Sequence, residues 1–103
     1  MKKKPDEIIE ILIRHKQELK EKFGIIKIGV FGSFVKGKET KKSDIDIYVE
    51  LDIEKVTLSK YLELVAYLES LFGRKVDILT RDSVETIRIP HIKEGIKKEI
   101  IYA

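Results

Sequence analysis

Residues 29–51 read GVFGSFVKGKETKKSDIDIYVEL. Its second half alternates apolar and polar residues, which is typical of a strand with one buried face. Asp44 and Asp46 fall on the same face of that strand, where two ionised carboxylates repel each other unless a cation lies between them. The stretch therefore predicts a half-buried strand over 44–51 with its acidic face turned outward, and it points to a metal site.

Immediately upstream, residues 25–31 (IIKIGVF) are rich in β-branched residues and bounded by glycines, so they predict a second strand. The strand ends at Gly32-Ser33, where we expect a helical turn and then an exposed loop through Lys42. Gly32 permits close approach, and free backbone N–H groups with the Ser33 hydroxyl suit a phosphate. The alternative is an ordinary strand-to-helix turn with Ser33 as its N-cap.

The rest of the chain completes an alternating pattern of helices and strands. Apolar residues at helical spacing predict helices over 6–23 and 58–72, each followed by a glycine. Residues 75–80 predict a third strand, and Pro90 separates a loop from a final helix that contains Ile92, Ile96 and Ile100. We therefore predict an α/β fold, with a small mixed sheet of at least three strands and helices packed on it, in a single domain over residues 1–103.

The composition excludes several classes of function. A net charge of +3 is small against 21 basic and 18 acidic residues, so it does not by itself predict nucleic-acid binding. The absence of cysteine excludes disulfides, thiolate catalysis and thiolate metal sites. The N-terminal Met-Lys-Lys-Lys is followed by acids where a signal peptide needs an apolar core, and no segment has membrane-spanning length. We expect a cytoplasmic protein that binds neither a membrane nor nucleic acid directly.

Two common phosphate-binding motifs do not fit the glycine-serine turn. A P-loop would need a Ser or Thr hydroxyl after Gly37-Lys38, but Glu39 stands there, and the dinucleotide pattern G-x-G-x-x-G does not occur. The carboxylate pair itself favours Mg²⁺ over zinc, because hard oxygen ligands suit Mg²⁺. The alternative for the pair is solvated acids on an exposed strand face.

Taken together, these residues resemble a known superfamily, the DNA polymerase β-like nucleotidyltransferases. The chain is similar, over nearly its whole length, to the minimal nucleotidyltransferases of the MntA antitoxin type. The resemblance is carried by a glycine-serine pair, ten intervening residues, an Asp-x-Asp and a later strand acid: Gly32, Ser33, Gly37, Ser43, Asp44, Asp46 and Asp77.

The resemblance implies a role for each matching position. Gly32 and Ser33 would bind the triphosphate of a nucleotide, and the same nucleotide site would include Lys36 and Ser43. The catalytic carboxylates, which would also hold Mg²⁺, would be Asp44, Asp46 and Asp77. Asp77 would in addition accept the proton of the attacking hydroxyl; its alternative is a structural pair with a lysine. Phe34 and Val35 make the turn more apolar than in many relatives.

The implied activity is Mg²⁺-dependent protein adenylylation. The chain would move AMP from ATP to a tyrosine hydroxyl of a partner HEPN-type RNase toxin and so neutralise it, as the antitoxin of a toxin–antitoxin pair. Two alternatives stay open: a binding module that acts by occlusion without catalysis, and nucleotidyl transfer to a small-molecule hydroxyl. The short chain favours a protein acceptor, because we expect no further domain that could hold a small-molecule acceptor.

Overall fold

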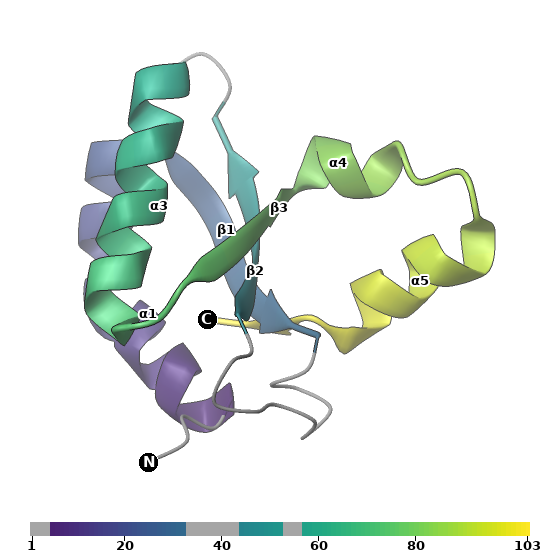
Figure 1. Ribbon diagram of the computed structural model, residues 1–103, viewed down its shortest axis with the longest axis horizontal. Coiled ribbons are helices and arrows are strands. Elements are labelled where there is room, and N and C mark those ends of the chain that lie inside the picture. Colours follow the sequence, from purple (N-terminus) through teal and green to yellow (C-terminus); the bar gives the residue numbers. More distant parts are fainter. Residues whose placement is uncertain (1–4, 33–43, 53–56) are drawn as a thin grey trace.

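The structure is a computed structural model that describes residues 5–32, 44–52 and 57–103. Helices lie on both faces of a four-stranded sheet (Figure 1). Along the chain, the elements are α1 (Pro5–Phe23), β1 (Ile25–Phe31), β2 (Ile45–Leu51), α3 (Leu58–Phe72), β3 (Val76–Thr80), α4 (Arg81–Glu85), α5 (Pro90–Glu99) and β4 (Ile101–Tyr102).

The sheet is mixed, as the sequence predicts, and has four strands in the order β3-β2-β1-β4. β1 runs antiparallel to both β2 and β4, so the polar segment between β1 and β2 joins two neighbouring strands. β2 and β3 run parallel, and α3 forms the crossover that a parallel connection requires. The predicted α/β fold with helices packed on a small mixed sheet is confirmed.

The main core lies between one face of the sheet and the pair α1 and α3, which lie side by side in Figure 1. The alternation of β2 explains this core, because every second residue from Ile45 to Val49 points into it. β1 contributes Ile28 and Val30, which are buried opposite Val49 and Ile47. The helices contribute the apolar residues that recur at helical spacing: Ile8, Leu12, Leu19, Phe23, Leu64, Leu68 and Phe72.

Local signals set the ends of α3. The Thr57 side chain accepts a hydrogen bond from Lys60 N at 3.2 Å, so it caps the first turn. At the other end Gly73 adopts a left-handed conformation, with φ 63°, and its N–H donates to Glu69 O at 2.9 Å. In the part of the chain that the structure describes, no helix combines the length and apolar character needed to cross a membrane.

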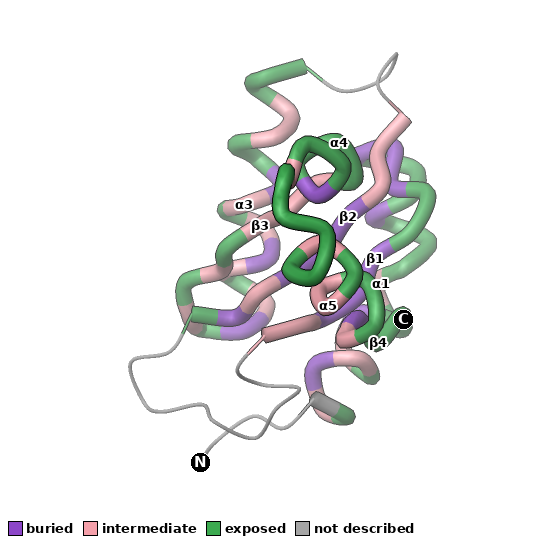
Figure 2. Tube along the Cα trace, turned by 90° about the vertical axis from the view of Figure 1, so that its right-hand side faces the viewer, coloured by how far each residue is buried: buried purple, intermediate pink, exposed green. Residues whose placement is uncertain are grey.

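The opposite face of the sheet carries a second, smaller core, which corrects one expectation. Tyr48 belongs to the face of β2 that was predicted to be turned outward, yet its side chain is buried with Val84 and Ile100. The reason is that α4 and α5 cover this face, although their own outer surfaces are exposed (Figure 2). The sequence pattern after Arg81 was too weak to predict α4, so the cover over Tyr48 was missed.

The C-terminal strand is a second departure from the sequence prediction. The final helix ends at Glu99, and Ile100, which was placed in it, is extended with ψ 126°. β4 follows and pairs with Gly29 and Val30 of β1. Gly29 permits this approach, because a Cβ there would lie 2.7 Å from both Ile100 Cγ2 and Ile101 O. A two-residue strand has too short a pattern to be predicted from alternation.

Ion pairs join α4 to α5 through one carboxylate. Glu85 Oε1 lies 2.6 Å from Lys97 Nζ, and Glu85 Oε2 lies 2.9 Å from Lys93 Nζ. The hydrogen bond from Lys97, and then that from Lys93, lower the pKa of Glu85 to about 2. Because the charged form is favoured in the folded state, these contacts stabilise the fold above the ordinary carboxyl pKa and are lost as pH falls.

We therefore expect Glu85→Gln to reduce the acid sensitivity of the protein. As pH falls from about 4.5 to about 2, the wild-type melting temperature should drop by more than that of Glu85→Gln, which has no proton to gain. Thermal unfolding followed by circular dichroism measures both. Glu21→Gln, at a carboxylate that accepts from the neutral Gln17 amide, is the control and should retain the wild-type pH dependence. Parallel curves for the wild type and Glu85→Gln would contradict the assignment.

Candidate active site

Strand pairing brings the predicted acidic residues to one end of the sheet. Asp46 is in register with Phe31 of β1 on one side and with Asp77 of β3 on the other. Neighbouring strands lie about 4.8 Å apart, and residues in register on parallel strands project to the same face. Asp46 and Asp77, which are 31 positions apart in the sequence, are therefore neighbours on the face opposite the main core.

Asp44 lies just before this pair. It is exposed and immediately precedes β2, whose first residue, Ile45, donates its N–H to Lys75 O at 3.0 Å. That hydrogen bond aligns the beginnings of β2 and β3. Asp44, Asp46 and Asp77 thus lie at one end of the sheet, where β2 and β3 both begin.

Gly32 lies against the Asp46 carboxylate. Its φ is +76°, a conformation that L side chains rarely adopt, and a Cβ built there would overlap Asp46 Oδ2 and lie 2.9 Å from Cγ. Within the protein, the group that lies against Gly32 is a carboxylate, and the approach of a phosphate to Gly32 stays a prediction. Glycine at this position lets the Asp46 carboxylate take the space that a side chain of residue 32 would need.

The carboxylates differ in exposure. Asp77 is exposed and Asp46 is partly buried between its neighbours. The alternative that Asp77 serves as half of a structural ion pair has no support, because no lysine or arginine in the described ranges forms a salt bridge with it. An exposed acid at a strand start, beside another acid, is available to a ligand from solution.

The side chains at this end of the sheet suit a hard cation such as Mg²⁺, because all three offer carboxylate oxygens. Glycine at position 32 is compatible with the Asp46 carboxylate, because a side chain there would overlap it. However, among the residues that the structure describes, no three or more acidic, histidine or cysteine side chains are gathered closely enough to hold a metal ion. The register brings the backbone positions together, and the three-carboxylate metal site stays a prediction.

The remaining predicted nucleotide-binding residues, Ser33, Lys36 and Ser43, lie outside the described residues, as does the helical turn expected after Gly32. The lysines at 38, 41 and 42 lie there too. Of the predicted nucleotide-binding set, Gly32 is the member whose position the structure gives.

Tyr48 shares the face of Asp46 but serves a different purpose. Its hydroxyl donates to Glu50 Oε2 at 3.0 Å, and its ring meets Tyr102 edge-on, with the centroids 6.1 Å apart. Burial, followed by the hydrogen bond to Glu50, raises the pKa of Tyr48 far above its ordinary value. Tyr48 is thus a neutral core residue in the second core.

Phe31 is the neighbour of the site that the sequence analysis missed. It is partly buried, it is in register with Asp46, and it precedes Gly32. Its ring packs against the second core, which links the end of β1 to the layer formed by α4 and α5. Pairing the two predicted strands as antiparallel neighbours would have placed it there.

Comparison with known proteins identifies the family of the chain and several relatives. Residues 12–103 match the family described as Nucleotidyltransferase domain. A protein of Thermococcus cleftensis named Protein adenylyltransferase MntA is 41% identical over 97 residues, which cover 94% of this chain and 93% of the relative.

Solved structures with the same fold were also found. One, described provisionally as a minimal nucleotidyltransferase, superposes with a TM-score of 0.67 at 28% identity. The match covers 91% of this chain and 93% of the chain in that structure. Another is a toxin–antitoxin crystallised with AMP-PNP, which superposes with a TM-score of 0.64 at 20% identity over 90% of this chain and 69% of its own. At that lower identity the second likeness concerns the fold alone.

Proposed function

The chain belongs to the nucleotidyltransferase domain family, and from this premise we propose that it transfers AMP from ATP to a tyrosine hydroxyl of a partner protein. The partner we propose is a HEPN-type RNase toxin, which the transfer would neutralise in the cytoplasm. We further propose that residues 1–103 act as one domain. The proposal refines the activity of the family, nucleotidyl transfer, by naming the donor and the acceptor.

One observation carries the proposal: the register that places Asp46 between Asp77 and the end of β1, with Gly32 against its carboxylate. Two carboxylates in register on paired strands, beside a glycine, supply the oxygen donors that a divalent cation takes. A cation or a phosphate-bound metal would offset the repulsion between them. The arrangement therefore supports a metal-bound nucleotide as the ligand at this end of the sheet.

The transfer that we propose uses the chain's own groups in the following way. A tyrosine oxygen forms a bond to the α-phosphorus of ATP, the bond from that phosphorus to the bridging oxygen breaks, and pyrophosphate leaves. The hydroxyl proton passes to the Asp77 carboxylate, which is exposed and therefore accessible to the acceptor. Mg²⁺ held by Asp44, Asp46 and Asp77 would supply charge neutralisation for the phosphates. Gly32 and Ser33 would orient the triphosphate, with Lys36 and Ser43 nearby.

The relative named Protein adenylyltransferase MntA supports a protein as the acceptor. It is matched over nearly the full length of both chains, so this chain has the extent of a protein-modifying relative. A protein of the same fold occurs in a toxin–antitoxin structure with AMP-PNP, a nucleotide of the kind we propose as donor. The HEPN class of the partner and the tyrosine acceptor rest on the sequence resemblance.

The test is to incubate the chain with ATP, Mg²⁺ and the purified partner, and to measure the partner's mass and its ribonuclease activity. We expect the partner to gain AMP on a tyrosine and to lose ribonuclease activity, and we expect neither change with Asp44→Asn. Full inhibition by Asp44→Asn without a gain in mass would establish occlusion instead. An unmodified partner together with AMP on a small hydroxyl compound would establish nucleotidyl transfer to a small molecule.

A further inference from the structure

The outer edge of β1 is open along its N-terminal half. In the described residues, β4 pairs with Gly29 and Val30, and Ala103 N then donates to Ile28 O at 2.9 Å. Beyond that hydrogen bond, toward residue 25, no described strand lies along this side of β1. An open edge presents backbone N–H and C=O groups that another extended chain can pair with.

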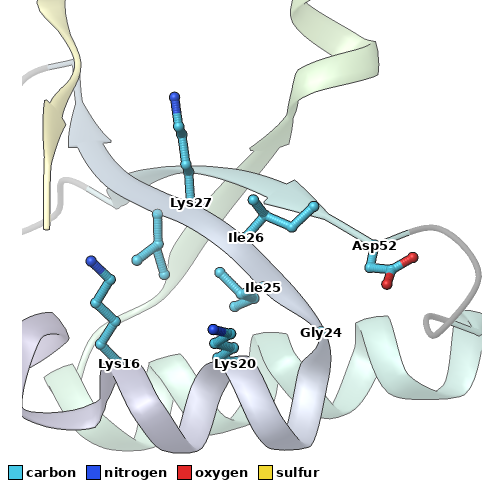
Figure 3. Close-up of a pocket in the computed structure, with 8 residues that line it drawn as sticks. Lys16, Lys20, Gly24, Ile25, Ile26, Lys27 and Asp52 are labelled. Carbon is cyan, nitrogen blue, oxygen red and sulfur yellow. The ribbon is translucent and has the colours of Figure 1, made fainter.

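A cavity of about 370 Å³ follows this open edge (Figure 3). One wall is α1, which contributes Lys16 and Lys20, and the other is β1 from Ile25 to Ile28; Asp52 also lines the cavity. Ile26 lies at an irregularity in the pairing with β2, and 61% of its surface is exposed. The cavity thus combines a strand edge, an exposed apolar side chain and basic groups.

The lysines approach the edge from both faces of the sheet. Lys16 and Lys20 rise from α1 on one side, whereas Lys27 projects from β1 away from α1 (Figure 3). Lys27 Nζ lies 5.7 Å from the centre of the Tyr102 ring, so it is positioned beside the end of β4. Lys16 Nζ already donates to a backbone oxygen, Ala103 O, at 3.3 Å. Successive side chains of an added strand would point to alternate faces and meet a lysine on each.

We propose that this edge binds an extended acidic segment of the protein that the chain modifies, which would pair with β1 as an additional strand. The charge of the edge selects this occupant, because its three lysines outnumber the one lining acid, Asp52, and acidic side chains on either face would balance this excess. A second copy of this chain would instead bring lysine against lysine, which disfavours self-pairing. The inference rests on the proposed function for the identity of the partner, whereas the binding itself requires no catalysis.

The probe is a short blocked peptide with adjacent central glutamates between valine and threonine residues, added to the ¹⁵N-labelled full chain. We expect backbone amide shifts and slowed hydrogen exchange within residues 25–28. Lys16→Glu/Lys20→Glu should weaken binding by about tenfold, since it removes two exposed ion pairs with the peptide. Arg88→Glu/Lys98→Glu makes the same change in net charge at exposed positions of the α4–α5 region and should leave binding unchanged.

Several results would overturn the inference: no shifts within 25–28, equal binding of a peptide with lysines in place of the glutamates, or the same weakening in both double variants. Amide shifts that depend on protein concentration without peptide would assign the edge to a second copy. Tighter binding of a single-stranded RNA oligonucleotide at these residues would assign it to nucleic acid. Asp46→Asn should bind the peptide normally. Failure of the wild-type chain to transfer AMP, with retained peptide binding, would overturn the proposed function and leave the edge site standing.

Discussion

Asp46→Asn is expected to lower the rate of AMP transfer by at least about a hundredfold to a thousandfold, the usual loss when one electrostatic contact to the reacting groups is removed. Asparagine has nearly the same shape, so the contact with Gly32 and the pairing with Phe31 and Asp77 should persist. What is lost is the negative charge at the position between the two neighbouring strands. The fold should therefore survive while the chemistry fails.

The measurement is the initial rate of AMP incorporation into the partner, together with calorimetric titration of ATP in the presence and absence of Mg²⁺. In Asp46→Asn, the Mg²⁺-dependent part of the free energy of ATP binding should change by more than the free energy of unfolding does. Asp82→Asn, at an exposed acid in α4, is the matched control and should transfer AMP at the wild-type rate. An unchanged Mg²⁺-ATP titration in Asp46→Asn would refute the metal assignment.

Gly32→Ala is expected to impair both stability and transfer. An alanine at φ +76° costs about 1–2 kcal/mol in backbone conformation alone. Its methyl group would also collide with the Asp46 carboxylate, so that carboxylate must move. Because a displaced catalytic group lowers the rate steeply, we expect a loss of about a hundredfold in AMP transfer in addition to the loss in stability.

Gly73→Ala separates the two effects. Gly73 has a similar φ of +63°, but a Cβ there meets nothing within 4 Å. Denaturant unfolding should therefore show a cost of about 1 kcal/mol for Gly73→Ala, and the transfer rate should be unchanged. Gly95→Ala, in an open helical position, should instead stabilise α5 by up to about 1 kcal/mol. If Gly32→Ala transferred AMP as well as Gly73→Ala, the close approach to Asp46 would have no role in the reaction.

Much of the fold follows from periodicity that is visible in the sequence. The long helices α1 and α3 carry apolar residues at helical spacing and end at glycines, and both were predicted within one residue of their observed bounds. β2 alternates strictly, and its core-facing residues are those that the pattern selects. The elements that were missed, α4 and β4, have five and two residues, which is less than the length over which a period becomes visible.

The candidate site was predictable in composition but only partly in geometry. The spacing of Gly32 and the aspartates identified the residues, and strand alternation placed Asp77 on the opposite face from Ile78, as the register now shows. No local pattern gives the register between β2 and β3, because it depends on how α3 packs across the sheet. Likewise the burial of Tyr48 depends on α4 and α5, which come from a distant part of the chain.

The register between β2 and β3 fixes the positions of the carboxylates and of the core residues together. Asp46 and Asp77 alternate with Ile45, Ile47, Val76 and Ile78 along the two strands. A deletion of one residue before Val76 would shift β3 by one place, turning Asp77 toward the main core under α1 and α3 and its isoleucine neighbour toward the opposite face. Substitutions can therefore replace the acids one at a time, but an insertion or deletion that moves them also disrupts the core. A homologue that has lost catalysis should keep the same backbone, with other side chains at positions 44, 46 and 77.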